Sequence, residues 1–189
     1  MNKNICVYCS SSNSLDEKYY KIAYELGSVL AKEGCSLVYG GSTRGCMGKV
    51  AQGFLDNNGK VTGIIPQVLN EKKGIENPPG AEIIVTKDMN IRKQLMEEKA
   101  DVFLALPGSF GTLDEIIQVI VTKQLSYHKK AIIFLDVDNF YEPLFDMFEN
   151  FYKNGFAKDI CRELFFVAKN VNEVVEYCKN YVEKEFEYK

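Results

Sequence analysis

Residues 100–115 read ADVFLALPGSFGTLDE and contain a short apolar run, a glycine-rich turn and the beginning of an amphipathic helix. Residues 102–106 are all apolar, which is typical of a strand buried on both faces of a parallel sheet. Gly108 and Gly111 let the backbone turn sharply and approach a ligand, and Thr112 starts the helical apolar period. Because a helix N-terminus carries unpaired N–H donors and a partial positive charge, this turn predicts a phosphate-binding site.

The same alternation of extended and helical patterns runs along the whole chain, with glycine, proline, asparagine and serine between the segments. Strands are expected at residues 4–8, 36–39, 60–65, 81–85, 102–106, 131–135 and 164–167. The first helix is expected to start at a capping box formed by Ser14 and Glu17 and to end at Gly34. Further helices are expected near residues 46–57, 89–99, 112–126, 141–154 and 171–186. Strands separated by such helices need crossover connections, so the sequence predicts a three-layer, doubly wound, Rossmann-like α/β fold with a mainly parallel sheet.

Length and composition limit the kind of protein. The chain has 189 residues and is expected to form a single domain, residues 1–189. Its formal net charge is −3 and its basic residues are scattered, so neither a nucleic acid nor a membrane surface is expected as a partner. The polar start MNKNICVYCSSS does not resemble a signal peptide, and we expect a cytoplasmic protein. The six cysteines are expected to be free thiols, with Cys6 and Cys9 on opposite faces of one strand.

Three small or glycine-rich segments follow predicted strands, at residues 9–12, 40–48 and 107–112. In a doubly wound sheet, ligands bind beyond the carboxyl ends of the strands, so these segments are candidates for one shared site. The sequence GGSTRGCMGK from residue 40 is not a P-loop, because Thr43 stands where the first glycine is required and Val50 follows the lysine. A turn of this kind is also a common tight connection, and the residues leave both interpretations open.

Several charged positions have both a structural and a functional interpretation. Glu115 lies three residues after Thr112, so it either completes a capping box or serves as a catalytic acid or base. Arg92 and Lys93 lie in the first turn of a predicted helix, where cations oppose the helix dipole, so they either point into solvent or pair with an anion. His128 is the only histidine, and its polar surroundings predict a solvated loop rather than a metal site.

Four segments together resemble the motifs of the LOG (lonely guy) family of cytokinin riboside 5′-monophosphate phosphoribohydrolases, also labelled lysine decarboxylases. The family pattern PGGxGTxxE is met, with serine for the second glycine, at Pro107, Gly108, Ser109, Phe110, Gly111, Thr112 and Glu115. The pattern GGGxxGxMGxVA is met, with one shifted residue, at Gly40, Gly41, Gly45, Met47, Gly48, Val50 and Ala51. The MHERK element appears as Met89, Asn90, Ile91, Arg92 and Lys93. The QLGxHxK element appears as Gln124, Leu125, Ser126, His128 and Lys130.

The resemblance implies an enzyme that hydrolyses the N-glycosidic bond of a nucleoside 5′-monophosphate and releases the free base and ribose 5-phosphate. It implies that Arg92 and Glu115 are the catalytic pair, that no metal or organic cofactor takes part, and that the protein is a homodimer with its sites near the subunit interface. The residues expected to bind the substrate and its phosphate are Ser11, Ser12, Gly41, Gly45, Met47, Gly48, Met89, Lys93, Pro107, Gly108, Ser109, Phe110, Gly111 and Thr112.

Two alternatives share these residues. A carrier of a nucleotide or phosphorylated cofactor would use the same turns without catalysis, and Asn90 and Ile91, which replace two polar groups beside Arg92, are compatible with it. A general AMP nucleosidase would share every residue named above. Ser109 is a further departure from the family pattern, because a serine would be strained there if the backbone requires a positive φ.

Overall fold

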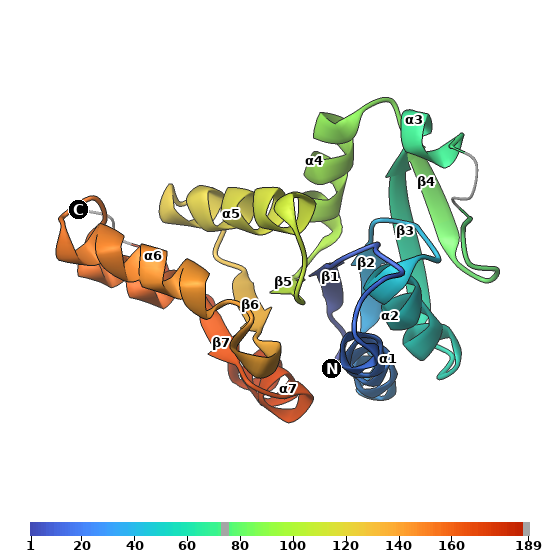
Figure 1. The fold of residues 1–189 in the computed structure, drawn as a ribbon, viewed down its shortest axis with the longest axis horizontal. Helices are drawn as coiled ribbons and strands as arrows, with labels where there is room; N and C mark the ends of the chain where they lie inside the picture. Colours follow the sequence, from blue (N-terminus) through green and yellow to red (C-terminus); the bar gives the residue numbers. More distant parts are fainter. Residues whose placement is uncertain (73–75, 187–189) are drawn as a thin grey trace.

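The computed structural model describes residues 1–72 and 76–186. Within them, seven short segments form strands: β1 (Asn4–Tyr8), β2 (Ser36–Tyr39), β3 (Lys60–Pro66), β4 (Glu82–Thr86), β5 (Val102–Ala105), β6 (Ala131–Leu135) and β7 (Phe166–Ala168). They make one sheet in the order β4-β3-β2-β1-β5-β6-β7, and every neighbouring pair is parallel (Figure 1). The central strands β5 and β6 are buried along their whole length, as their continuous apolar sequences predict.

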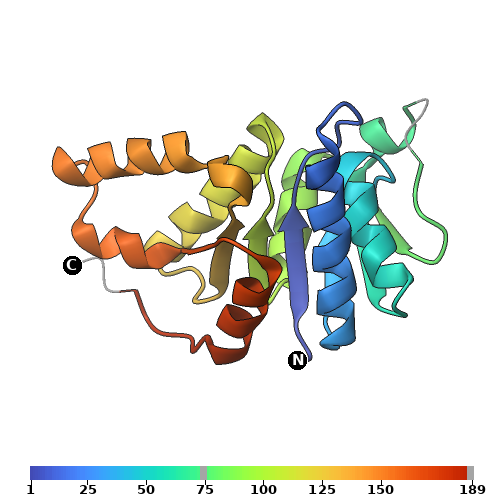
Figure 2. The same cartoon turned by 60° about the horizontal axis from the view of Figure 1, so that its bottom comes forward.

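Helices cover both faces of the sheet, so the predicted doubly wound α/β fold is confirmed (Figures 1 and 2). On one side lie α1 (Glu17–Lys32), α2 (Gly45–Leu55) and α7 (Val171–Asn180), and on the other lie α4 (Met89–Lys99), α5 (Phe110–Gln124) and α6 (Glu142–Lys153). Shorter elements are α3 (Gln67–Asn70) and the 3-10 helices η1 (Val137–Asn139) and η2 (Asp159–Leu164).

Successive residues of each strand supply two separate hydrophobic cores, one on each face. In β1, Ile5 and Val7 pack toward the side of α1 and α2, whereas Cys6 and Tyr8 pack toward the side of α4 and α5. All six cysteines are free and buried, in agreement with the expectation of free thiols. Cys9 belongs to the first of these cores and Cys6 to the second, so the two sulfurs lie on opposite faces as predicted.

Several helix ends differ from the prediction. The cap of α1 is Asp16, whose side chain accepts a hydrogen bond from the Lys18 N–H at 3.0 Å, so the predicted capping box at Ser14 is wrong. The last helix ends at Asn180 rather than at residue 186. The last strand begins at Phe166 instead of Leu164, because Leu164 is the last residue of η2. In the described part of the chain, no helix combines the length and apolar character that crossing a bilayer would require.

Candidate active site

The three segments predicted to bind a ligand lie together at the carboxyl end of the sheet. The loop after β1 packs on the start of α2, where the Gly45 N–H donates to Asn13 Oδ1 at 2.8 Å. The loop after β2 reaches α4, because a Cβ atom at Gly40 would lie 2.7 Å from Arg92 Nη2. Arg92 in turn pairs with Glu115 of α5, so the third segment joins the other two.

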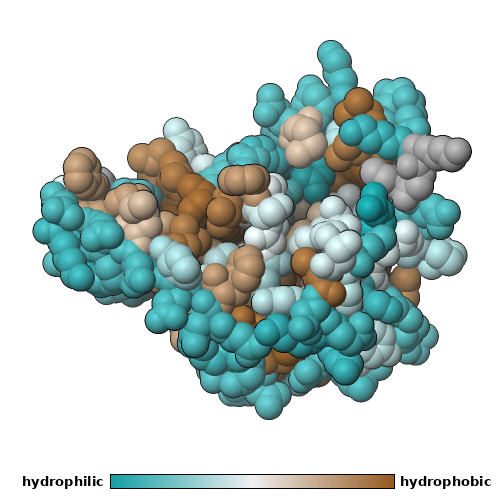
Figure 3. Space-filling model, in the orientation of Figure 1, coloured by the Kyte–Doolittle hydropathy of each residue, from teal (hydrophilic) through white to brown (hydrophobic). Residues whose placement is uncertain are grey.

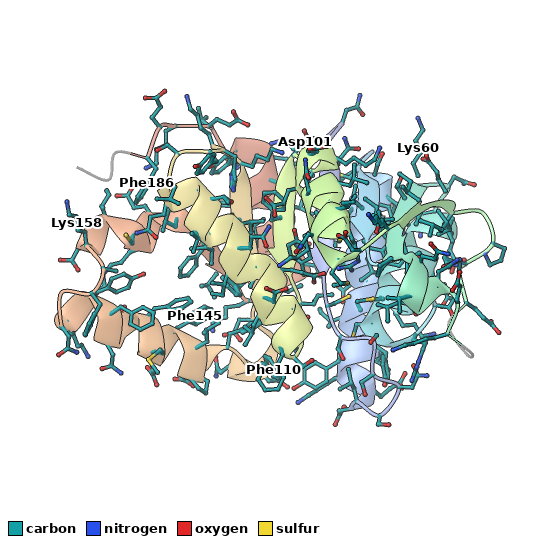
Figure 4. The ribbon with its side chains drawn as sticks, turned by 90° about the horizontal axis from the view of Figure 1, so that it is seen from above. Lys60, Asp101, Phe110, Phe145, Lys158 and Phe186 are labelled. Atoms are coloured by element: carbon teal, nitrogen blue, oxygen red, sulfur yellow. The ribbon has the colours of Figure 1, made fainter. Side chains whose placement is uncertain are left out.

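The position of α5 shows which edge of the molecule this is. Phe110, the first residue of α5, lies at the edge opposite Asp101 and Lys60, which stand at the amino ends of β5 and β3 (Figure 4). The N-terminus of α5 therefore lies at the carboxyl ends of the strands, where ligands bind in folds of this class.

Arg92 and Glu115 form a buried ion pair at the centre of the site. They are 5 % and 6 % exposed, and Arg92 Nη1 donates a hydrogen bond to Glu115 Oε1. Arg92 Nε donates to the Ile64 carbonyl of β3 at 2.9 Å, which fixes the guanidinium between the sheet and α5. Because α5 begins at Phe110, Glu115 lies in its second turn and binds Arg92 instead of the helix start. The capping-box interpretation of Thr112 and Glu115 is therefore wrong.

Burial and the charge of Arg92 have opposite effects on the pKa of the Glu115 carboxyl. Burial raises its pKa above the ordinary value of 4.5, while the positive charge of Arg92 and its hydrogen bond oppose that shift. No described residue donates a hydrogen bond to Glu115 Oε2, so this oxygen remains available to a bound molecule. The arrangement holds a carboxylate beside a fixed cation in a region of low solvent access, where its electrostatic effect on a ligand is strong.

The N-terminus of α5 carries unused hydrogen-bond donors. Among the described residues, no acceptor bonds to the backbone N–H groups of Phe110, Gly111 or Thr112. The preceding residue, Ser109, makes no side-chain cap. The loop can turn so tightly because residue 108 is glycine: a Cβ atom there would lie 2.0 Å from Thr112 Oγ1. This combination of free donors and helix dipole is suited to a phosphate group.

The N-termini of α2 and α4, at the same edge, are less suited to binding an anion. The N-terminus of α2 bonds to its own chain, since the Met47 N–H donates to the Ser10 carbonyl at 3.3 Å and the Gly48 N–H to the Arg44 carbonyl at 3.1 Å. α4 is capped by the carboxylate of Asp88, which accepts from two backbone N–H groups and would repel a phosphate. The predicted phosphate position is therefore best matched at α5.

The glycines before and inside α2 have a packing role. Gly41 has a φ of +84° and its Cβ would lie 3.2 Å from Ile65, while a Cβ at Gly48 would lie 1.9 Å from the Thr43 carbonyl oxygen. Small residues at these points let the loop after β2 lie close to the site. Ser11 is exposed and Ser12 half-buried at the same edge.

The remaining predicted site residues have individual surroundings. Lys93 pairs with Asp114 of α5 at 3.0 Å. Met89 is 40 % exposed at the start of α4, and Pro107 is buried between β5 and the loop. Ser109 has a φ of −108°, a conformation that any residue adopts, so the expected strain from replacing glycine does not arise.

His128 is held in place instead of being solvated. Its Nε2 lies 2.9 Å from the Val119 carbonyl and its Nδ1 accepts from the Lys130 N–H at 3.2 Å. Burial lowers its pKa to about 4, so the ring is neutral at pH 7. The predicted solvated role is wrong, and His128 instead fixes the connection between α5 and β6. In the part of the chain that the structure describes, no three His, Cys, Asp or Glu side chains are grouped to hold a metal ion.

A supporting network behind the phosphate loop was not predicted. The Tyr141 hydroxyl donates to the Leu106 carbonyl at 2.6 Å, one residue before Pro107. The Tyr141 N–H donates to Asp136 Oδ1 at 2.9 Å, and Lys169 Nζ lies 2.7 Å from Asp136 Oδ2. The sequence feature that could have indicated this network is Asp136, a carboxylate that directly follows the buried strand β6.

Comparison with known proteins shows which family the chain belongs to. Residues 47–178 match the family model described as "possible lysine decarboxylase". The chain is 37 % identical over 180 residues to the cytokinin riboside 5′-monophosphate phosphoribohydrolase LOG of Oryza sativa subsp. japonica, covering 95 % of this chain and 74 % of the relative. It is 38 % identical over 179 residues to the corresponding enzyme LOG5 of Arabidopsis thaliana, covering 95 % of this chain and 78 % of the relative.

Solved structures show the same architecture. The molybdenum cofactor binding protein of Rippkaea orientalis superimposes with a TM-score of 0.72 at 23 % identity, over 95 % of this chain and 96 % of that one. At this identity the likeness concerns the fold alone. The sequence matches, by contrast, cover most of the chain and show its family. The chain belongs to the LOG family, whose curated members carry the name cytokinin riboside 5′-monophosphate phosphoribohydrolase.

Proposed function

We propose that the protein hydrolyses the N-glycosidic bond of a nucleoside 5′-monophosphate, of the cytokinin or adenine type, to the free base and ribose 5-phosphate. The names of the family's curated members support this reaction. One structural observation carries the proposal. The buried Arg92–Glu115 pair stands directly behind the open backbone donors at the start of α5.

The spacing along α5 suits a nucleotide. The phosphate would accept hydrogen bonds from the N–H groups of Phe110, Gly111 and Thr112. Glu115 is three to five residues further along the helix, which corresponds to about 5–8 Å along its axis. A ribose bound between them would place its anomeric carbon near the free oxygen of Glu115. The loops with Ser11, Ser12 and residues 41–48 would close the pocket.

The chemistry requires an ionised carboxylate at this point. Breaking the glycosidic bond creates an oxocarbenium-like sugar cation, which a carboxylate stabilises, and the same group can take a proton from the attacking water. Burial raises the pKa of Glu115, and the charge and hydrogen bond of Arg92 lower it, which favours the ionised form. Arg92 would also orient the nucleotide, because one side of its guanidinium faces the loop at Gly40.

We also propose that the protein acts as a homodimer. The surface over α5 and α6 carries a band of hydrophobic side chains (Figure 3). Its exposed members and their exposed fractions are Val121 (43 %), Leu125 (60 %), Met147 (52 %) and Phe151 (38 %). Phe110 is 90 % exposed at the start of α5. A clustered apolar surface of this kind is typical of a subunit interface, and a second copy covering it would lie near the proposed nucleotide site.

The reaction can be tested directly. Pure protein is incubated with AMP and with isopentenyl-AMP, and the released base is measured by chromatography. Glu115→Gln should lower turnover at least ~100-fold while nucleotide binding persists, because the carboxylate is lost and the shape is kept. Glu98→Gln, an exposed position on α4, is the matched control and should turn over normally.

The outcomes separate the alternatives. Normal turnover by Glu115→Gln would restrict Glu115 to a structural role. Nucleotide binding without turnover by the wild type would identify a carrier. Equal rates with AMP and isopentenyl-AMP would indicate a general AMP nucleosidase.

A further inference from the structure

A cavity of about 520 Å³ lies at the end of α5 that is remote from the proposed active site. It is open on one side and is lined by the C-terminal end of α5, η2, β7, α7 and residues 181–186. Phe186 lies near this end of α5 and Phe110 at the other (Figure 4). Lys123, on its wall, is eight residues beyond Glu115, or about 12 Å along the helix. The volume is in the range that holds a small organic ligand.

Aromatic rings form much of the cavity wall. The rings are those of Phe165, Phe166, Tyr177, Tyr181 and Phe186. Phe166 and Tyr177 are stacked with their centroids 4.3 Å apart. Residues 181–186 are held across the cavity by the Tyr181 hydroxyl, which donates to the Lys129 carbonyl at 2.7 Å, and by the Phe186 carbonyl, which accepts from Ser126 Oγ at 3.0 Å. The cavity therefore has built aromatic walls.

The one ammonium group deep in this wall has no carboxylate partner among the described residues. Lys123 is 4 % exposed, and its Nζ donates to the Tyr181 hydroxyl at 3.0 Å and lies 5.1 Å from the centroid of that ring. No described carboxylate lies within 4.0 Å of it. Burying an ammonium without a counter-ion is costly, and a bound anion would relieve that cost.

We propose that this cavity binds a small aromatic carboxylate, whose anionic group pairs with Lys123 and whose ring packs among the aromatic side chains of the wall. Such a ligand both pairs with the ammonium group and covers the apolar surface. An inorganic anion would do only the first, and a neutral aromatic molecule only the second. The site is separate from the nucleotide site and does not depend on the proposed reaction.

The charges around the cavity opening are already paired with each other. Lys184 Nζ lies 2.5 Å from Glu163 Oε2, and Lys129 Nζ lies 2.8 Å from Glu185 Oε1, all at exposed positions. They offer weak, solvent-screened contacts to an anion. Desolvation, with a further contribution from Lys184, lowers the pKa of Lys123 to about 8, while Glu183 raises it. A ligand that needs the charged ammonium should therefore be released at higher pH.

Calorimetric titration of the full chain with benzoate, phenylacetate and 2-naphthoate tests the site. At least one should bind, and Lys123→Met, which keeps the apolar stem and removes the charge, should weaken that binding at least ~10-fold. Lys184→Met, at the exposed opening, should change it less than ~3-fold. Phenylacetamide, the neutral counterpart of phenylacetate, should bind at least ~10-fold more weakly. In the wild type, binding should weaken at least ~10-fold between pH about 7 and about 9.5.

Circular dichroism melting shows whether Lys123→Met is folded. The pH series on the wild type tests the role of the Lys123 ammonium without any variant. Equal binding of a carboxylate to wild type and Lys123→Met would overturn the proposal. So would pH-independent binding, or the absence of binding by all three carboxylates at about 10 mM. AMP should not compete with the carboxylate, and competition would place it in the nucleotide site instead.

Discussion

Arg92 and Glu115 compensate each other's charge in a buried position. Removing either partner from such a pair leaves an uncompensated charge, which typically costs about 3–5 kcal/mol of stability. A pair of this kind contributes little to stability compared with well-packed apolar residues, so its presence at the carboxyl end of the sheet fits a catalytic role better than a structural one.

The pH dependence of activity should reflect the environment of Glu115. Because burial raises its pKa, the carboxyl keeps its proton to a higher pH, and activity that needs the ionised form should fall on the acid side at a pH above 4.5. Asp114 raises this pKa and Lys93 lowers it. Asp114→Asn should therefore move the acid limb of kcat/KM to lower pH, and Lys93→Met to higher pH. The same direction of shift in both variants would exclude Glu115 as the titrating group.

The first turn of α5 shows how much of an element can be read from its sequence. The strand and the turn follow from apolar pattern and glycine, and helix polarity makes the turn a candidate for phosphate binding. The start of the helix does not follow in this way, because Phe110 and Gly111 look like loop residues, whereas the helix begins at Phe110. The same error left two interpretations open for Glu115, because a helix starting at Thr112 would have made it a cap.

Gly111→Ala separates the folding and binding roles of this turn. Among the described atoms, nothing lies within 4 Å of a Cβ at this position, and alanine favours helix over glycine by up to about 1 kcal/mol. The variant should be as stable as the wild type or more stable in thermal melting, yet its KM for AMP should rise at least ~10-fold because the methyl group occupies phosphate space. An unchanged KM would show that the phosphate does not bind at the N-terminus of α5.

Tyr141→Phe tests the support behind the loop. Loss of its hydroxyl leaves the Leu106 carbonyl without this hydrogen bond. The free energy of unfolding, measured in urea, should therefore fall by about 1 kcal/mol. If the network positions the loop, KM for AMP should also rise several-fold. Tyr24→Phe, whose hydroxyl bonds to Asp56 on the surface, should alter neither quantity. A loss of stability with unchanged KM would restrict the network to folding.

In the whole molecule, local pattern predicted the sheet and its helices well, because each strand and helix had its own periodicity. Contacts between distant segments could not be predicted in this way. Arg92 and Glu115 lie on separate helices, and the bonds from Tyr141 to Leu106 and from Lys123 to Tyr181 span 35 and 58 positions. Such pairs depend on how distant segments pack. The family motifs suggested Arg92 and Glu115 but did not indicate the bonds of Tyr141 and Lys123.

The apolar face over α5 and α6 should control the oligomeric state. Leu125→Glu places a charge in the proposed interface, and in sedimentation analysis it should shift a dimer toward monomer. Val68→Glu, an equally exposed apolar position on α3 at 62 % exposure, should leave the dimer intact. A monomeric wild type, or equal behaviour of the two variants, would contradict the proposed homodimer.

The crystal structure of Glu115→Gln with AMP bound tests the arrangement itself, because the variant should bind the nucleotide without cleaving it. The account predicts phosphate oxygens at hydrogen-bond distance from the N–H groups of Phe110, Gly111 and Thr112, with C1′ of the ribose about 4 Å from the side chain of residue 115. A phosphate bound elsewhere, or a ribose turned away from residue 115, would contradict it.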